Sequence, residues 1–290
     1  MTNISIWFEA LRPKTLPASI VPVALGSAIA AIDGKFTWSI FIATLLCAAL
    51  MQIASNFINE IYDFRRGADT PLRLGPRRAV SEGVISEQNM KFAALIAITV
   101  AFLIGLYLTS IAGWPIFVVG VISLAAAWAY TGGKYPLAYI GLGEAMAFIF
   151  YGIIAVCGVY YIYTGTVTQS AVMLSLAPAA LSANILAVNN IRDIETDRIA
   201  GKRTFAVRFG VIYARVMYAI FTVIPFITTI ALVSAGYSKY IMLSFVAIPA
   251  AVMLIIGVVR RKGADLNPIL AGTGALLAVY AVLLIIGLFV

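Results

Sequence analysis

Long apolar runs alternate with short polar segments along almost the whole chain. A helix that crosses the hydrocarbon core of a bilayer needs about 20 mostly apolar residues. The pattern therefore predicts an all-α integral membrane protein with nine spanning helices. We place these at Leu16–Ile32, Trp38–Tyr62, Lys91–Ile111, Trp114–Thr131, Ile140–Tyr163, Thr168–Ile191, Tyr213–Ala235, Tyr240–Val259 and Pro268–Val290. The polar stretch from Asp63 to Met90 separates the second span from the third.

Composition strengthens this interpretation and removes several kinds of chemistry. Hydrophobic residues make up 62% of the 290 positions and charged residues only 11%, whereas soluble domains carry roughly 25% charged residues. A soluble enzyme and a disordered chain are both excluded. The sequence contains no histidine, so histidine-based zinc sites and histidine general bases are absent as well. We treat residues 1–290 as a single transmembrane domain.

The charges fall on one side of the membrane if there are nine spans. Every Lys and Arg except Lys35 and Lys239 lies on the side of the membrane that carries the N-terminus, in or beside the loops there. The positive-inside rule then places the N-terminus in the cytoplasm and the C-terminus outside, and we expect a multi-pass protein of the cell (inner) membrane. Every acid except Asp33 is on that side too. Because the rule makes no demand on acids, their clustering predicts a polar cavity at the cytoplasmic side of the bundle.

Two polar segments, 59–69 and 189–197, repeat the pattern Asn-x-x-x-Asp at the end of a long apolar run. Residues four apart share one helix face, so each Asn should point the same way as its Asp. Gly67 can end the first helix and let a further Asp fold back. The polar residues concerned are Asn59, Asp63 and Asp69 in the first segment and Asn189, Asp193 and Asp197 in the second.

Carboxylate and amide oxygens are the ligands that Mg²⁺ prefers, often together with phosphate oxygens. Two such segments facing each other would hold magnesium ions and a diphosphate between them. A basic cluster follows each segment, and its side chains would neutralise the remaining negative charge. The candidates are Arg78 after the first segment and Lys202 and Arg203 after the second. The alternative is that the acids are ordinary solvated loop residues.

Three further polar residues lie in or near the loop between the fourth and fifth spans. Tyr130 and Lys134 would share a helix face if the helix continued through Gly132 and Gly133. Otherwise they are an interfacial tyrosine and a lysine that extends to the membrane surface. Glu144 is either a charge at a helix N-terminus or a residue of the site.

At these residues the chain resembles the UbiA superfamily of intramembrane aromatic prenyltransferases, and within it most of all the 1,4-dihydroxy-2-naphthoate polyprenyltransferases of menaquinone biosynthesis. The resemblance rests on the residues at 12–16 (RPKTL), 63–70 (DFRRGADT), 73–80 (RLGPRRAV), 83–86 (GVIS), 189–197 (NNIRDIETD) and 201–210 (GKRTFAVRFG). One departure is that this chain has Asn59-Glu60-Ile61 where the family usually has Asn-Asp-Tyr.

The resemblance implies a UbiA-like bundle of nine helices whose second and sixth helices carry the Asp-rich motifs. It implies magnesium-dependent transfer of a polyprenyl group from polyprenyl diphosphate to an aromatic acid, with loss of CO₂ and diphosphate, giving demethylmenaquinol. The partners would be these substrates and membrane lipid, with no nucleic acid. The implied metal ligands are Asp63, Asp69, Asp193 and Asp197 with Asn59 and Asn189. These four Asp residues would act in catalysis together with Tyr130 and Lys134, and the implied diphosphate ligands are Asn59, Arg78, Asn189, Lys202 and Arg203.

Two kinds of alternative remain. The acceptor would be 4-hydroxybenzoate, homogentisate, a chlorophyllide, haem or a glycerol phosphate lipid in other members of the superfamily. A secondary transporter would instead place its carboxylates near the bilayer midplane on broken helices, whereas the acids here lie at one face among many bases.

Overall fold

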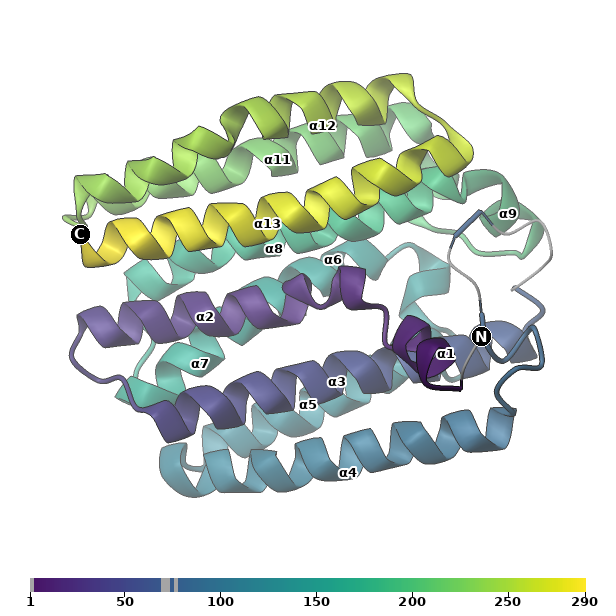
Figure 1. Cartoon of the computed structure of the whole chain (residues 1–290), viewed down its shortest axis with the longest axis horizontal. Helices are drawn as coiled ribbons and strands as arrows, with labels where there is room; N and C mark the ends of the chain where they lie inside the picture. Colours follow the sequence, from purple (N-terminus) through teal and green to yellow (C-terminus); the bar gives the residue numbers. More distant parts are fainter. Residues whose placement is uncertain (1–2, 69–73, 76–77) are drawn as a thin grey trace.

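The chain folds into a long bundle whose helices run side by side along one axis (Figure 1). A computed structural model describes residues 3–68, 74–75 and 78–290, and within them the regular structure is entirely helical. The all-α architecture predicted from the apolar runs is confirmed. Helices suit this environment because they satisfy every backbone hydrogen bond within one segment, which a bilayer interior requires.

The helices follow the predicted spans closely. The helical elements in the first half are α1 (Asn3–Ala10), η1 (Pro13–Thr15), α2 (Pro17–Ile32), α3 (Trp38–Arg65), α4 (Glu87–Ala112), α5 (Trp114–Thr131) and η2 (Leu137–Ile140). The fifth span is continuous from α6 (Gly143–Phe148) through η3 (Ile149–Ile154) to α7 (Ala155–Thr164). The remaining elements are α8 (Gln169–Arg192), α9 (Ile194–Ile199), α10 (Phe205–Phe209), α11 (Val211–Ser234), η4 (Lys239–Ala247), α12 (Ile248–Arg260), η5 (Gly263–Leu266) and α13 (Asn267–Phe289).

Eight helical stretches in the described part of the chain are long and apolar enough to cross a membrane. The predicted first span is the exception, because α2 has only 16 residues, a rise of about 24 Å. It is nevertheless a member of the bundle, packed against α3, α7, α8 and α13. All nine predicted spans are therefore present as helices, and one of them is short.

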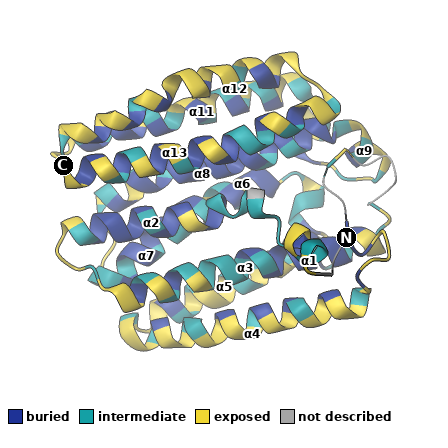
Figure 2. Ribbon diagram, in the orientation of Figure 1, coloured by how far each residue is buried: buried dark blue, intermediate teal, exposed yellow. Residues whose placement is uncertain are grey.

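The sixth span, α8, forms the centre of the bundle and contacts α11, α6, α13 and α2. Its buried positions include eight small residues, namely Ala171, Ser175, Ala177, Ala179, Ala180, Ser182, Ala183 and Ala187. Small side chains let neighbouring helices approach closely, which drives helix packing where lipid tails are as apolar as the side chains. The outer helices α4 and α12 instead present exposed apolar faces to the surroundings (Figure 2).

The fifth span changes its helical type where it meets α8. The segment η3 is a π-helix, a form that occurs mostly as a single wide turn within α-helices and often near functional sites. Gly152 of this turn lies against α8 so closely that a Cβ atom there would be 2.1 Å from the Cβ of Ala179. The absence of a side chain at Gly152 is thus what allows the two helices to touch.

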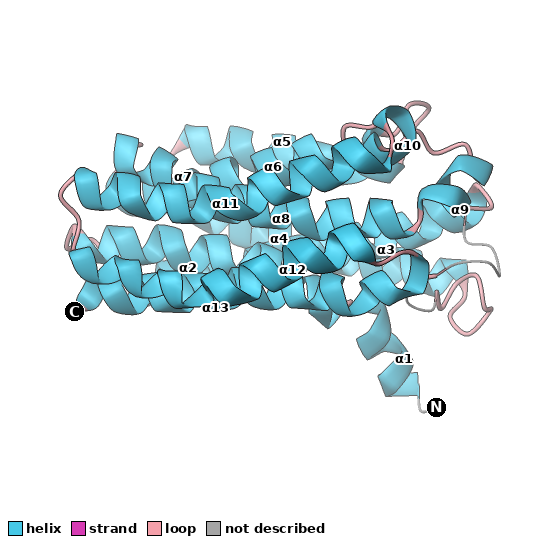
Figure 3. Ribbon diagram, turned by 90° about the horizontal axis from the view of Figure 1, so that it is seen from above, coloured by secondary structure: helices cyan, strands magenta, loops and turns pink. Residues whose placement is uncertain are grey.

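The polar segments gather at one end of the bundle. The N-terminal α1 and the short α9 lie at the same end, and the C-terminus lies at the opposite end (Figure 1). The view from above shows α9 and α10 together at this end, with α1 projecting from the bundle (Figure 3). Since α3 and α8 both finish here, the two Asn-x-x-x-Asp segments are brought to the same end, as their placement on two even-numbered spans, the second and the sixth, predicts.

Candidate active site

Three segments of the chain meet at Asp63, in the last turn of α3. One oxygen of its carboxylate, Oδ1, accepts a hydrogen bond from the Tyr139 hydroxyl at 2.9 Å and lies 3.1 Å from the Lys202 ammonium. The other, Oδ2, accepts from the Arg78 guanidinium at 3.2 Å. Asp63 is buried, so two positive charges and a hydroxyl compensate for its lost hydration. The first polar segment and the basic loop after the second are therefore in direct contact.

Tyr139, in η2, is held between two cations. The Arg66 guanidinium carbon is 4.9 Å and the Lys202 ammonium 4.8 Å from the centre of its ring, and both distances are within the range of cation–π attraction. Arg66 also donates a hydrogen bond to the carbonyl of Gly133. Sequence reasoning missed Tyr139, because an aromatic residue in a short loop between two spans carries no periodic signal of its own.

Glu60 supports this arrangement from the turn before Asp63. Its Oε1 accepts a hydrogen bond from the Val80 backbone amide at 3.0 Å, and its Oε2 lies 3.7 Å from Arg78. Both Glu60 and Arg78 are buried. Glu60 therefore holds the segment around Arg78 and Val80 against α3. Glu60 and Asp63 both contact Arg78.

Asn59 lies one helical turn before Asp63, and its Oδ1 accepts a hydrogen bond from the Thr131 hydroxyl at 2.8 Å. This contact ties α3 to the end of α5. Gly67 adopts a left-handed backbone conformation directly after α3, and so it ends the helix as predicted. Asp69, which we expected to fold back toward the site, is outside the described residues.

The second segment is organised by Arg192, at the end of α8. Its guanidinium binds Asp193 through two parallel hydrogen bonds of 2.8 and 2.6 Å. It also donates to Asn189 at 2.5 Å and to Asn267 at 2.8 Å. Asp193 and Asn189 are thus brought together as their spacing predicts, although through an arginine that the sequence did not single out. Asp197, four residues further along in the short α9, is also buried.

Tyr130 and Lys134 do not share a face. The helix α5 ends at Thr131 with Gly132 as its C-cap, so the expectation that depended on a continuing helix is not met. Lys134 is exposed, with its ammonium 5.4 Å from the ring of Tyr135. The Tyr130 hydroxyl lies at the start of α6, where a Cβ atom on Gly143 would be 3.2 Å from it. The charges of Asp63 and Asp197 act on this hydroxyl.

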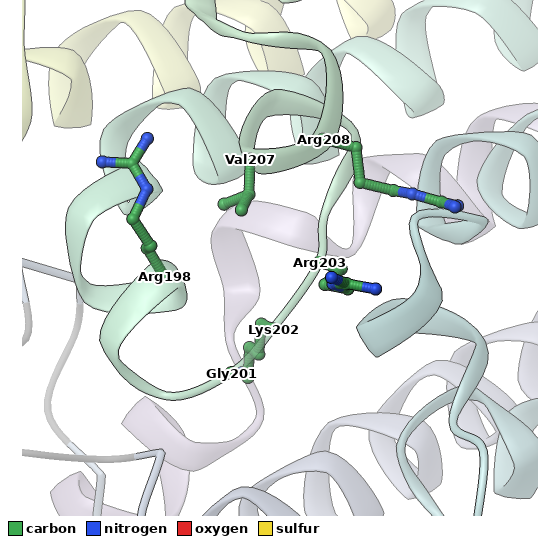
Figure 4. Close-up of a pocket in the computed structure, with 6 residues that line it drawn as sticks. All are labelled: Arg198, Gly201, Lys202, Arg203, Val207 and Arg208. Atoms are coloured by element: carbon green, nitrogen blue, oxygen red, sulfur yellow. The ribbon is translucent and has the colours of Figure 1, made fainter.

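A basic pocket of about 550 Å³ opens beside the loop between α9 and α10. Its lining consists of Arg198, Gly201, Lys202, Arg203, Val207 and Arg208 (Figure 4). The backbone amide of Arg203 donates to the carbonyl of Tyr139 at 2.9 Å, and the Arg208 side chain donates to the carbonyl of Ile140 at 2.8 Å. The loop between α9 and α10 is thereby fixed against η2. Arg203 lines this pocket, and Lys202 connects it with Asp63.

The oxygen donors at this end of the bundle suit a hard divalent cation. They are carboxylates and side-chain amides, and the charges of both Asp63 and Asp197 act on Tyr130. Within residues 3–68, 74–75 and 78–290, no three acidic, cysteine or histidine side chains gather as a ready-made metal cluster. Cationic side chains contact the carboxylates of Asp63 and Asp193. Acids and bases are thus paired within both polar segments at this end of the bundle.

Comparison with known proteins agrees with this chemistry. A model described as the UbiA prenyltransferase family matches residues 19–271. The chain is 36% identical over 225 residues to the 1,4-dihydroxy-2-naphthoate octaprenyltransferase of Escherichia coli, covering 76% of this chain and 73% of that protein. It is 31% identical over 298 residues to the protein of the same name from Haemophilus influenzae, covering 99% and 97% of the two chains.

The fold has relatives among solved structures. A UbiA homolog from Archaeoglobus fulgidus bound to DMAPP and Mg²⁺ matches with a TM-score of 0.66 at 18% identity, covering 98% of this chain and 99% of that one. This likeness extends over the whole helical bundle. Together with the family match over most of the chain and the identity to the bacterial enzymes, it means that the chain belongs to the UbiA prenyltransferase family and is an integral membrane prenyltransferase.

Proposed function

We propose that the protein transfers a polyprenyl group from polyprenyl diphosphate to 1,4-dihydroxy-2-naphthoate, releasing diphosphate and CO₂ and forming demethylmenaquinol. The observation that carries this proposal is a sequence identity of 31%, along 99% of this chain, to an enzyme named for this acceptor. The geometry supports a diphosphate substrate, because Lys202 and Arg78 converge on Asp63 at one end of an apolar bundle.

The diphosphate would be bound by the cations around Asp63. Lys202 and Arg78 are the nearest, and Arg203 follows in the loop that lines the basic pocket. Positive side chains stabilise the negative charge that develops on pyrophosphate as the allylic C–O bond breaks. Their ion pairs with Asp63 gather them at this end of the bundle.

Mg²⁺ would be held by carboxylate and amide oxygens of the two polar segments. The residues are Asp63 and Asp69 with Asn59, and Asp193 and Asp197 with Asn189. When bound, the ion would neutralise charge on the leaving diphosphate. The solved relative bound to DMAPP and Mg²⁺ supports this assignment by analogy of fold.

The rest of the bundle would protect the reactive carbon. An allylic carbocation is quenched by water, and a site closed by apolar helices excludes it. Tyr130, on which the charges of Asp63 and Asp197 act, would present its hydroxyl and ring to the cation. The electron-rich ring of the acceptor then attacks, and departure of its carboxylate as CO₂ supplies the electrons, so no strong general base is required.

The site would face the cytoplasm in the inner membrane. This orientation follows from the positive-inside rule and from the gathering of Lys202, Arg203 and the other loop bases at the end of the bundle that carries Asp63. The acidic acceptor and the diphosphate head group would then both arrive from the aqueous side, while the polyprenyl tail stays among apolar helices.

One assay tests the acceptor. The purified protein is given labelled polyprenyl diphosphate, Mg²⁺ and one aromatic acid at a time, from a panel of dihydroxynaphthoate, 4-hydroxybenzoate and homogentisate. We expect prenylated product, with release of CO₂, from dihydroxynaphthoate alone. Prenylation of 4-hydroxybenzoate but not of dihydroxynaphthoate would overturn the proposal.

A further inference from the structure

One acidic side chain in the interior is not used by any step described so far. Glu144, near the start of α6, is 4% exposed. Its Oε1 accepts a hydrogen bond from the Asn190 side-chain amide at 2.8 Å. Its Oε2 is buried without a hydrogen-bond partner, and it is the only carboxyl oxygen in this condition among the described residues.

An incompletely paired carboxyl group inside a membrane bundle is costly. A buried polar atom without a partner loses its hydration and gains nothing in return, and ionisable residues at such places mark functional sites more often than structural ones. The hydrogen bond from Asn190 fixes the carboxyl group but leaves its second oxygen, Oε2, without a partner. This arrangement is typical of a carboxyl group that the protein holds in place so that a bound molecule can donate a hydrogen bond to its second oxygen.

The position of Glu144 indicates what completes it. Tyr130 interacts electrostatically with Glu144 as well as with Asp63 and Asp197. Its hydroxyl is so near the start of α6 that a Cβ atom on Gly143 would lie 3.2 Å from it. Tyr130 therefore has Glu144 and the proposed magnesium ligands Asp63 and Asp197 in its surroundings. A molecule that meets the allylic carbon beside Tyr130 is thus in the neighbourhood of Glu144.

We propose that Glu144 is a specificity-determining residue whose Oε2 accepts a hydrogen bond from a ring hydroxyl group of the aromatic acceptor. This inference rests on the proposed function. A carboxyl group is suited to a phenolic hydroxyl, which donates, and unsuited to the carboxylate of the same acceptor, which repels it. Sites that hydrogen-bond a substrate hydroxyl reject analogues without it strongly, because the buried partner is then left unpaired.

The test uses the full-length enzyme in lipid nanodiscs with Mg²⁺, varying dihydroxynaphthoate at saturating polyprenyl diphosphate and then the reverse. For Glu144→Gln we expect the KM for dihydroxynaphthoate to rise by about 10-fold or more, with the KM for polyprenyl diphosphate unchanged. Asn184→Ala is the matched control, because this buried amide of α8 binds Tyr218 and Thr222 of α11. It should lower the unfolding temperature without changing either KM.

A ligand series identifies the hydroxyl group. The two mono-O-methyl ethers of dihydroxynaphthoate are measured as inhibitors of the wild type and of Glu144→Gln. The ether that lacks the donating hydroxyl should bind both proteins equally, whereas the other ether should bind the variant about 10-fold more weakly. Equal effects of the substitution on both ethers, or a parallel rise of both KM values, would mean that Glu144 has only a structural role.

The outcomes separate the two proposals. If the wild type prenylates no dihydroxynaphthoate, the proposed function fails, and this inference fails with it. If the wild type is active and Glu144→Gln keeps its KM for the acceptor, only the inference fails. Should the variant not fold, the ethers decide with the wild type alone: two ethers that inhibit it as strongly as each other would overturn the inference.

Discussion

Asp63 shows how a single side chain combines what the sequence reveals with what only the fold reveals. Its place in an Asn-x-x-x-Asp pattern at the end of a span marks it as a polar residue with a function. Its partners Tyr139 and Lys202 come from segments 76 and 139 positions further along the chain. Contacts of that range have no local pattern, so they follow from packing alone.

The substitution Asp63→Asn removes the negative charge and keeps the size of the side chain. We expect the rate of prenyl transfer at saturating substrates to fall by about 100-fold or more, as when an electrostatic group of an active site is removed. The concentration of Mg²⁺ needed for half-maximal activity should rise as well. Initial rates measured over a magnesium titration check both effects.

The matched control is Asp33→Asn at the opposite end of the bundle. Asp33 also accepts a hydrogen bond from a tyrosine, with the Tyr160 hydroxyl at 2.6 Å, and it belongs to no acidic segment. This variant should keep wild-type activity and the same magnesium dependence. Equal losses in the two variants would contradict a special role for Asp63.

Lys134 illustrates where residue-level reasoning stopped. Its predicted place beside Tyr130 assumed helical spacing across Gly132, but α5 ends at Thr131. Two consecutive glycines allow either outcome, so the pattern could not decide between them. Arg192 was missed for the opposite reason: an arginine at a span end is ordinary under the positive-inside rule, and its four hydrogen bonds depend on how α8 ends.

At the scale of helices, prediction from the apolar runs was accurate to within a few residues. The second span, for example, was expected at Trp38–Tyr62 and is observed at Trp38–Arg65. Length and hydropathy decide such elements because the bilayer imposes the same requirement on each of them. The π-helical turn at Ile149–Ile154 could not be predicted, since it depends on contact with α8 rather than on its own sequence.

The contact of that turn with α8 gives a prediction at this scale. In Gly152→Ala, the new Cβ would lie 2.1 Å from the Cβ and 2.3 Å from the Cα of Ala179. Overpacking of a tight interior costs about 1–3 kcal/mol, so the free energy of unfolding should fall by at least this amount. Titration with a denaturing detergent measures the change.

Gly158→Ala, in the continuing helix α7, is the control for helix propensity. A Cβ there meets no atom within 4 Å, and alanine is a better helix former than glycine by up to about 1 kcal/mol. This variant should be as stable as the wild type or more so. If Gly152→Ala behaved in the same way, the close approach of η3 to α8 would not be a constraint on stability.

For the whole molecule, the distribution of charge sets the orientation in the membrane. We expect the loop at Lys35 to lie outside the cell and the loop at Lys262 to lie in the cytoplasm. Both side chains are exposed, while the native Cys47 and Cys157 are half-buried and buried. Single cysteines can therefore be introduced at these positions, because the native cysteines are poorly accessible to a thiol reagent.

Labelling with a membrane-impermeant thiol reagent tests the orientation. In intact spheroplasts, Lys35→Cys should react and Lys262→Cys should react only after the membrane is permeabilised. The wild type controls for the native cysteines. The reverse pattern would place the candidate active site on the outer face, where a cytoplasmic acceptor could not reach it.

The meeting of Asp63, Tyr139 and Lys202 also constrains how sequences of this kind diverge. Each of the three residues contacts the other two, so a change in one alters the surroundings of both others. Drift at these positions should therefore be correlated, with replacements accepted in combination rather than singly. The apolar faces of α4 and α12, which need only remain apolar, are free to vary one residue at a time. Across distant descendants, the outer helices should lose their resemblance long before this triplet does.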